Sequence, residues 1–171
     1  MISAIVAVNA NWGIGYNGQL LEHISDDLKR FKELTSNNTV VMGRKTWESL
    51  PNKPLPNRFN IVLTSTPSQM EQTVNTKFLT MDDFLMNLDS LEEFMNEYGK
   101  EIFIIGGDQI YHSLLPIYDR VYVTKIYKSH ENVDSYFPNL DNDNNWKMVS
   151  ASEIFTNNNL TYQFCCYDRV S

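Results

Sequence analysis

Short apolar runs rich in β-branched residues recur along the chain, and helical or turn-rich stretches separate them. Runs that are apolar on both faces are typical of strands in a central, largely parallel sheet that helices cover. Two further runs flank a polar turn cluster, which favours an antiparallel hairpin at the end of the chain. The predicted strands are Ile2–Val8, Thr39–Met42, Asn60–Leu63, Lys77–Leu79, Glu101–Ile105, Arg120–Tyr127, Trp146–Ile154 and Leu160–Asp168.

Helices are predicted over Asp26–Thr35, Lys45–Leu50, Met81–Tyr98 and Asp108–Leu115. The fold class is therefore α/β: a central mixed, mostly parallel sheet of eight strands, flanked by about four helices, with a C-terminal antiparallel hairpin. No repeat or interdomain linker divides the chain, so we expect one domain over residues 1–171. The longest aperiodic stretch, Asn9–Ile24, is rich in glycine and leads into a helix, which suits a loop that closes over a ligand.

The composition indicates an ordinary globular protein, with 42% hydrophobic and 20% charged residues. No apolar run approaches the roughly 20 residues that span a bilayer, and the first residues lack the early Lys or Arg of a signal peptide. We therefore expect no membrane partner and a cytoplasmic location. We also expect a monomer, which these observations do not test. The two cysteines are adjacent, Cys165 and Cys166, and this spacing matches no zinc or redox motif.

Charge is distributed unevenly along the chain. Residues 29–58 hold seven of the fourteen Lys and Arg and only two acidic residues, while the formal net charge is −7. The rest of the chain therefore carries −12, which would repel nucleic acid or an anionic membrane. A small anionic ligand bound at the basic segment fits this distribution, although a merely solvated basic surface fits it as well.

A predicted strand ends at Gly43, and Arg44, Lys45 and Thr46 then open a helix. Glycine lets the backbone approach a ligand closely, and a helix start presents unpaired N–H groups, so this is a candidate anion-binding corner. Taken alone, an ordinary strand-to-helix turn explains these residues equally well. Two similar junctions, Ile61–Pro67 and Ile104–Tyr111, match neither a dinucleotide fingerprint nor a P-loop. Because ligands of open α/β sheets bind beyond the carboxyl ends of strands, the three corners could hold one extended phosphorylated ligand.

Asp27 differs from its charged neighbours because it shares the apolar stripe of its helix with Phe31 and Leu34. Such a carboxylate is either stabilised by the helix N-terminus, for which Ser25 is the expected cap, or placed to bind a ligand. No Ser-His-Asp constellation stands out, and the histidines lack metal-ligand spacing, so we expect no metal. The chemistry would then belong to a bound cofactor.

Nearly end to end, the chain resembles a bacterial-type dihydrofolate reductase. The order and spacing of the matching stretches together are highly specific, although no single stretch is. They are Ile2–Ala7, Trp12–Gly15 with Asn17-Gly18, Asp27-Leu28 with Phe31-Lys32, Val41–Leu50, Pro54–Arg58, Ile61–Ser65, Ile104–Gly107 with Tyr111, Val123-Thr124, and Asp134 with Phe137-Pro138.

The resemblance implies NADPH as cofactor and dihydrofolate as substrate, with antifolates as inhibitors. Arg44, Lys45 and Thr46, with Thr64 and Ser65, would hold the phosphates and the adenosine end. The whole implied cofactor set is Ala7, Ile14, Gly15, Gly18, Gln19, Gly43, Arg44, Lys45, Thr46, Leu63, Thr64, Ser65, Gly106, Gly107, Asp108, Gln109 and Ile110.

For the substrate, the resemblance implies a cleft lined by Ile5, Leu28, Phe31, Leu50, Leu55, Ile105 and Tyr111, with Arg58 on the glutamyl α-carboxylate. Asp27 would hold the pterin, with Thr124 behind it and Leu20 in the loop that closes over the site. A hydride would pass from the nicotinamide to C6 of the pterin while water carries a proton to N5. A related reductase of riboflavin synthesis and a non-catalytic nucleotide-binding module are the alternatives.

The chain departs from the family pattern after Leu20. The family usually has Pro-Trp there and a proline where Ser25 stands, whereas this chain has Leu21 and Glu22. The tryptophan normally packs beside the pterin, so a carboxylate removes apolar area and adds a negative charge. We hypothesise that Glu22 and Asp27 titrate as a coupled pair, while a Glu22 that turns to solvent is an equal alternative.

Overall fold

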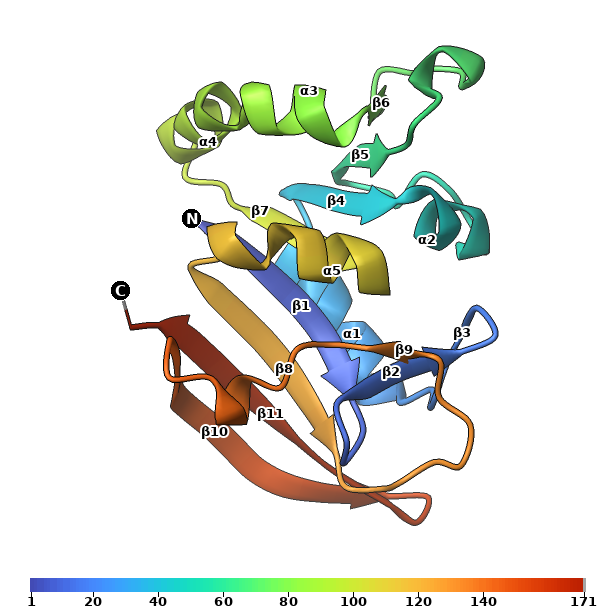
Figure 1. Cartoon of the computed structure of the whole chain (residues 1–171), viewed down its shortest axis with the longest axis vertical. Helices are drawn as coiled ribbons and strands as arrows, with labels where there is room; N and C mark the ends of the chain where they lie inside the picture. The colour runs from blue at the N-terminus through green and yellow to red at the C-terminus, as the bar shows by residue number, and fades with distance from the viewer. Residues whose placement is uncertain (171) are drawn as a thin grey trace.

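The computed structural model describes residues 1–170 and contains an eight-stranded sheet in the order β10-β11-β8-β1-β7-β4-β5-β6 (Figure 1). The six strands from β8 to β6 in this order are parallel, and β11 pairs antiparallel with both β8 and β10. The predicted mixed sheet and C-terminal hairpin are confirmed, with every strand boundary within three residues of its prediction. The strands are β1 (Ile2–Val8), β4 (Thr39–Gly43), β5 (Phe59–Leu63), β6 (Thr76–Leu79), β7 (Ile102–Gly106), β8 (Arg120–Ile126), β10 (Trp146–Asn157) and β11 (Leu160–Arg169).

Alternate residues of the central strands pack on opposite faces of this sheet. On β4, Val41 joins the larger core cluster, whereas Val40 and Met42 join a second cluster around Trp47. This division follows from the two-residue period of a strand, and it explains why the runs are apolar throughout. In Figure 1, α5 (Asp108–Leu114) lies in front of the sheet and α1 (Ser25–Thr35) behind it.

Five α-helices flank the sheet among residues 1–170, one more than the four predicted. The single helix expected over Met81–Tyr98 is two helices, α3 (Met81–Met86) and α4 (Leu88–Glu97). Asn87 separates them with φ −102° and ψ 4°, a conformation between helix and turn. The apolar period continues across Asn87, so the pattern did not reveal the break. The remaining helix, α2 (Arg44–Ser49), follows β4.

The expected loop Asn9–Ile24 contains a hairpin, which corrects the prediction of an aperiodic segment. Strands β2 (Gly13–Tyr16) and β3 (Gln19–Leu20) pair with each other, and β2 also pairs with β9 (Ser135–Tyr136). Asn17 and Gly18 join β2 to β3 with φ of 52° and 77°, the two positive values of a type I′ turn. The Asn17 N–H donates to Asp134 at 2.9 Å, which ties the hairpin to the segment before β9.

The N-terminus of α1 also differs from the prediction. Ile24, not Ser25, is the N-cap residue, and its carbonyl accepts the Leu28 N–H at 3.1 Å. Ile24 is buried against Ile126 and Tyr162, so apolar packing sets where the helix begins. No helix in the described part of the chain is long and apolar enough to cross a membrane.

Candidate active site

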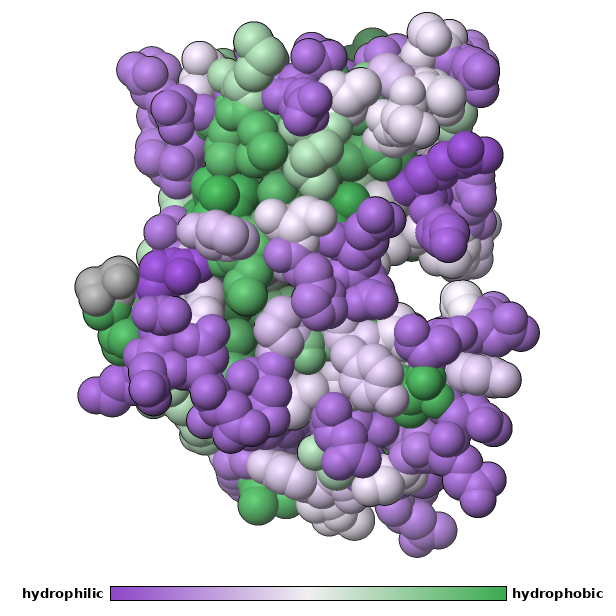
Figure 2. Space-filling view, viewed as in Figure 1, coloured by the Kyte–Doolittle hydropathy of each residue, from purple (hydrophilic) through white to green (hydrophobic). Residues whose placement is uncertain are grey.

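The three predicted anion-binding corners meet at one edge of the sheet. Gly43 at the end of β4 pairs in register with Leu63 at the end of β5, and Met42 pairs with Gly106 at the end of β7. The loops that follow these neighbouring parallel strands therefore begin side by side, as expected for a ligand site at the carboxyl edge. Figure 2 shows an open gap at this side of the molecule, between the region of α2 and that of β3.

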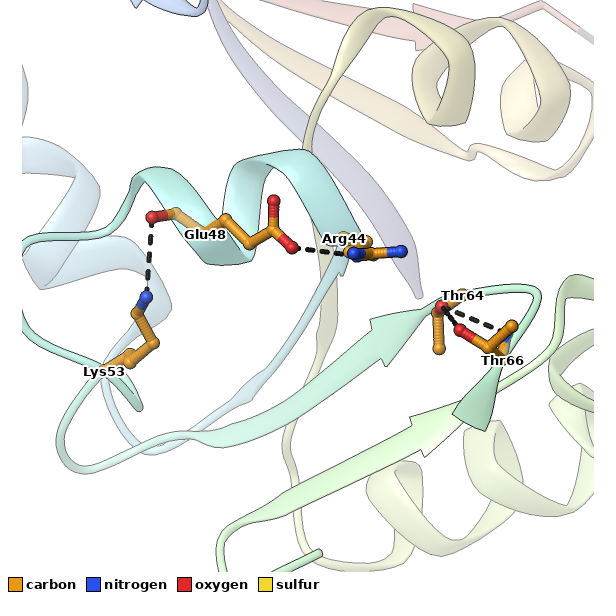
Figure 3. Close-up of polar contacts among 5 residues, drawn as sticks. All are labelled: Arg44, Glu48, Lys53, Thr64 and Thr66. Carbon is orange, nitrogen blue, oxygen red and sulfur yellow. Dashed lines mark hydrogen bonds and ion pairs between the residues drawn. The ribbon is translucent and has the colours of Figure 1, made fainter. Parts of the chain in front are cut away.

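The corner after β4 carries exposed cations. Arg44 and Lys45 are exposed, and Arg44 Nε contacts Glu48 Oε1 at 2.8 Å, one turn along α2 (Figure 3). Since the N-cap is Gly43, no side chain caps the first-turn amides of α2. Thr64 follows the adjacent strand, and its hydroxyl accepts the Thr66 N–H at 3.2 Å. The corner can hold an anion through cations, hydroxyls and backbone N–H groups.

Glycine is required at these corners for two different reasons. Gly43 has an ordinary φ of −79°, but a Cβ there would lie 2.8 Å from Ile110 Cγ1 of α5. Packing, and not the turn conformation expected from the sequence, excludes a side chain at Gly43. Gly106 has φ 139°, which side-chain-bearing residues rarely adopt, and a Cβ on Gly106 or Gly107 would lie 3.2–3.3 Å from Thr46 Oγ1.

The second glycine corner leads directly into α5. Gly107 is the N-cap of this helix and no side chain caps it, so its first amides also face the carboxyl edge. Asp108 is the first helical residue, and its carboxylate pairs with His112 Nδ1 at 3.0 Å. Gln109 is exposed, whereas Ile110 packs against the larger core. These glycines leave a backbone surface that an extended ligand could approach closely.

Asp27 reaches across from α1 to β8, where its Oδ1 accepts the Thr124 hydroxyl at 2.5 Å. Thr124 pairs in register with Ala7, so the carboxylate lies near the end of β1. Burial raises the pKa of Asp27 above its ordinary value, while the Thr124 bond and the charge of Arg30 oppose this shift. A carboxylate that is partly deprived of water and keeps free lone pairs is suited to binding a ligand with N–H donors.

Six of the seven residues that the resemblance assigned to the substrate cleft keep exposed surface, and the seventh, Tyr111, is buried. Leu28, close to Asp27 on α1, is 50% exposed, and the other five are only half-buried. Ordinary core residues on these strands and helices are buried instead, so this set forms an incompletely covered apolar surface. The set consists of Ile5, Leu28, Phe31, Leu50, Leu55 and Ile105.

Arg58 is a buried cation beside Phe31 of this apolar set. Its Nε donates to the Pro56 carbonyl at 2.9 Å, its Nη1 donates to Thr35 Oγ1 at 3.0 Å, and its guanidinium lies over the Phe31 ring. Because guanidinium has five N–H groups, these two bonds leave three N–H groups for a ligand. Two parallel bonds to a carboxylate need no more than that.

Tyr111 is buried on α5, and its hydroxyl donates to the Ile5 carbonyl at 2.7 Å. Burial raises the pKa of the Tyr111 hydroxyl above its ordinary value, with a further contribution from the charge of Asp27. Tyr111 therefore stays a neutral donor and fixes the backbone of β1 beside the carboxylate.

A narrow cavity lies where β1 meets the hairpin. Ala7, Ile14 and Leu20, which the sequence assigned to the nicotinamide end, all line it. Leu20 is 50% exposed, whereas Ile14 is buried. Gly15 is buried, and a Cβ there would lie 2.8 Å from the Gln19 carbonyl oxygen, whereas Gly18 and Gln19 are exposed. The hairpin thus brings part of the predicted cofactor set to the end of β1.

Glu22 has partners that sequence reasoning missed. Its Oε1 accepts from Lys128 Nζ at 2.8 Å and from His130 Nε2 at 3.1 Å. These hydrogen bonds, above all that from Lys128, lower the pKa of Glu22. The hypothesis of a coupled pair with Asp27 is not supported, because each carboxylate has its own partners, and the alternative of a solvated Glu22 is also wrong. Sequence offered no signal for contacts across more than a hundred residues.

Glu22 also borders a second pocket of about 460 Å³. Ser25, Lys128 and the tip of the β10–β11 hairpin line it together with Glu22, and most of these groups are polar. The pocket contains neither Asp27 nor the partly exposed apolar set, so we place the reaction at the carboxylate and not here. No group of three or more His, Cys, Asp or Glu residues within residues 1–170 could hold a metal ion.

The fold and the site define a class of protein: an α/β enzyme whose carboxyl edge is suited to an extended anionic cofactor, beside one partly buried carboxylate. The family model for dihydrofolate reductase matches residues 1–169, and the chain belongs to this family. It is an oxidoreductase that reduces dihydrofolate with NADPH.

Known relatives cover almost all of the chain. It is 40% identical to dihydrofolate reductase of Bacillus subtilis, covering 99% of this chain and 95% of that protein. It is 39% identical to dihydrofolate reductase of Schistosoma mansoni, covering 98% of this chain and 95% of that protein. Its structure matches dihydrofolate reductase from Enterococcus faecalis complexed with NADP(H) and RAB-propyl, with a TM-score of 0.83 and 32% identity, covering 100% of this chain and 97% of that one. The matches do not favour the alternatives from riboflavin synthesis or of a non-catalytic module.

Proposed function

We propose that Asp27 is the catalytic carboxylate with which this chain converts 7,8-dihydrofolate to 5,6,7,8-tetrahydrofolate. The observation that carries the proposal is the Asp27–Thr124 pair, a partly buried carboxylate beside the end of β1 and next to a half-exposed apolar surface. NADPH, when bound, supplies the hydride for C6 of the pterin. The tetrahydrofolate formed supports thymidylate, purine and one-carbon metabolism.

Asp27 would accept hydrogen bonds from the pterin amino group and a ring nitrogen. Thr124 donates to one carboxylate oxygen and so fixes its orientation, which leaves the other oxygen free for the ligand. The negative charge of Asp27 favours protonation of the pterin at N5, and water carries the proton because the carboxylate binds elsewhere on the ring. Leu20, from β3, would help to exclude bulk water at the cavity near Ala7.

The glycine-lined corners fit the phosphates of NADPH. No side chain caps the first amides of α2 or α5, so these backbone N–H groups are free to bind phosphate oxygens. Cations, hydroxyls and the start of α5 would complete the cofactor site, and the hairpin would cover the nicotinamide. The proposed set is Ala7, Ile14, Gly15, Gly18, Gln19, Gly43, Arg44, Lys45, Thr46, Leu63, Thr64, Ser65, Gly106, Gly107, Asp108, Gln109 and Ile110.

The partly exposed apolar set would bind the pterin and the aminobenzoyl group, as it would bind antifolates of similar shape. Arg58 would bind the glutamyl α-carboxylate through the N–H groups that Pro56 and Thr35 leave free. Tyr111, on α5, would support Ile5 through its hydrogen bond to the Ile5 carbonyl. A single domain, a monomer, a cytoplasmic location and the absence of a nucleic-acid partner complete the proposal. The formal charge of −7 supports the last of these.

The experiment that tests this function follows the loss of absorbance of reduced nicotinamide with dihydrofolate and NADPH. The wild-type chain should turn over, and Asp27→Asn should lose most of its kcat/KM. Asp26→Asn is the matched control, because Asp26 is exposed on the same helix and binds Tyr162 outside the proposed site. Full turnover in Asp27→Asn, or an equal loss in Asp26→Asn, would contradict the role given to Asp27.

A further inference from the structure

One imidazole contacts both ends of the segment that carries the β2–β3 hairpin. His130 Nδ1 lies 3.1 Å from Asn9 Nδ2, where the segment leaves β1, and His130 Nε2 lies 3.1 Å from Glu22 Oε1, just after β3. The backbone supports the same junction, since Ala10 N–H donates to the Lys128 carbonyl at 3.0 Å. The two ends of the segment are therefore joined through the connection between β8 and β9.

The orientation of the Asn9 amide determines which nitrogen of His130 carries the proton. Asn9 Oδ1 accepts two backbone N–H groups, from Asn11 at 2.9 Å and from Gly13 at 2.8 Å. These donors require the oxygen on their side, so the amide NH₂ group faces the imidazole. An NH₂ group only donates, and His130 Nδ1 must therefore accept. The neutral ring then carries its proton on Nε2 and donates it to Glu22.

The bridge is shielded from solvent, whereas the competing ion pair is not. The side chains of His130 and Glu22 are 15% and 20% exposed, and that of Lys128 is 51% exposed. Exposed ion pairs contribute little because solvent screens them. The Lys128 contact should accordingly matter less to the segment than the two hydrogen bonds of His130.

The segment held in this way covers the cavity beside the end of β1. Leu20 and Leu21 line that cavity with Ala7 and Ile126, and both ends of the bridge, Asn9 and Glu22, line it too. We propose that His130, as the neutral Nε2-protonated tautomer, is a positioning residue that joins Asn9 to Glu22, holds Leu20 and Leu21 over this cavity and thereby slows NADPH release. The effect on NADPH release rests on the proposed function, which places the nicotinamide of NADPH against the same segment.

The tautomer is tested first, by nitrogen-15 NMR of the ligand-free, full-length wild-type chain at pH 7.5. The chain contains three histidines, and the resonances of His130 are assigned by their absence from His130→Ala. We expect the shifts of a neutral ring protonated on Nε2. A ring protonated on Nδ1, or on both nitrogens, would overturn the proposal without reference to any ligand or activity.

Amide hydrogen exchange in the ligand-free protein tests whether the bridge holds the segment. Losing one hydrogen bond of ordinary strength should raise exchange of the Asn11 and Gly13 amides about fivefold in His130→Ala and in Glu22→Leu. Glu22→Gln keeps an acceptor oxygen for His130 and should stay near the wild type. Lys128→Met is the matched control and should change exchange less than His130→Ala. Equal exchange in Glu22→Leu and Glu22→Gln, or a larger effect in Lys128→Met, would overturn the proposal.

Release of NADPH tests the consequence for the cofactor. In a stopped-flow competition experiment, the dissociation rate constant should rise about fivefold in His130→Ala and in Glu22→Leu, the same factor as for exchange. Faster exchange with unchanged NADPH release would refute the effect on the cofactor but leave the proposed function intact. Failure of the proposed function itself would appear in the Asp27→Asn assay, while the tautomer and the exchange rates still decide whether the bridge exists.

Discussion

The two ends of the proposed site are built differently. At the substrate end, Asp27 and Arg58 are withdrawn from solvent and already bonded to Thr124 and Thr35 before any ligand arrives. At the phosphate end, Arg44 and Lys45 are exposed. Buried and pre-oriented groups discriminate strongly because a mismatched ligand leaves them unpaired, whereas exposed cations attract anions with less selectivity. We infer that substrate identity is decided at the substrate end and that the phosphate end supplies affinity.

The largest expected effect is at Asp27. Replacing Asp27 with Asn removes the negative charge that favours protonation of the pterin, and kcat/KM at pH 7 should fall about 10²–10³-fold. The measurement is steady-state kinetics with saturating NADPH. A loss confined to KM would show that Asp27 only binds the substrate.

Asp27→Asn should be more stable to thermal unfolding than the wild type, although it is less active. The pKa of Asp27 is raised by burial, so its ionised form destabilises the folded state at a pH above that raised value. Asp27→Asn should therefore unfold at a higher temperature than the wild type at pH 8, and the difference should shrink as the pH falls below the folded-state pKa and vanish below the unfolded-state pKa. Thermal unfolding followed by circular dichroism between pH 8 and pH 4 measures this, and a difference that grows toward acid pH would contradict it.

Arg58 should give the next largest effect. A lysine at this position cannot form two parallel bonds to a carboxylate and cannot keep both bonds to Pro56 and Thr35, so KM for dihydrofolate should rise about 30-fold. A dihydropterin without the glutamyl group is the control substrate, and its KM should be similar in both proteins. Equal increases for both substrates would place the loss in folding and not in carboxylate binding.

Packing at the cofactor corner can be tested with Gly43→Ala. The new Cβ would lie 2.8 Å from Ile110 Cγ1, so the free energy of unfolding should fall by about 1–3 kcal/mol. The double variant Gly43→Ala/Ile110→Ala removes the clashing neighbour, so its free energy of unfolding should fall by less than the sum of the two single losses. Urea denaturation of the four proteins measures the coupling, and strict additivity would contradict a steric cause.

At the phosphate end the effects should be smaller and sensitive to salt. Arg44→Gln removes one exposed cation, and KM for NADPH should rise about fivefold at low ionic strength and less than that at high ionic strength. Lys53→Gln is the control, because Lys53 lies in the same basic segment but contacts the Glu48 carbonyl at 3.4 Å. An effect of Arg44→Gln that persists at high salt would remove the contrast between the two ends.

Glu22 should have the smallest influence on stability. Its pKa is lowered mainly by the hydrogen bond from Lys128, so the stabilisation is present above its unfolded-state pKa and is lost as the pH falls through the lower folded-state pKa. Since the pair is partly exposed, Glu22→Gln should cost less than about 1 kcal/mol at pH 7 and nothing in strong acid. The pH–rate profile of Glu22→Gln should coincide with that of the wild type. A displaced profile would support the hypothesis that Glu22 and Asp27 titrate as a coupled pair.

The main sheet could be predicted because each strand has two buried faces and hence an unbroken apolar run, as in Val40–Met42. The β2–β3 hairpin was missed because strands of two to four residues carry almost no periodicity. One signal was present in Asn17-Gly18, a dipeptide typical of type I′ turns. The break at Asn87 had no comparable signal, since the apolar pattern of the helix continues through it.

The site could be predicted only in part. Gly43, Arg44 and Thr46 stand at a strand end, so sequence order alone places them at the carboxyl edge. Which residues face them from other elements depends on long-range packing, such as that which places Thr46 Oγ1 3.2–3.3 Å from where a Cβ of Gly106 or Gly107 would lie. The partners of Glu22 are of this kind, and a single sequence carries no information about them.

The Asn17-Gly18 turn also has a consequence for the chemical ageing of the protein. An exposed asparagine followed by glycine is prone to deamidate, because glycine offers no side chain to hinder attack of its backbone nitrogen on the amide. The product would carry a carboxylate beside Asp134, which now accepts the Asn17 N–H. Stored preparations should therefore become charge-heterogeneous at this hairpin first, and peptide mass spectrometry of aged samples would locate the change.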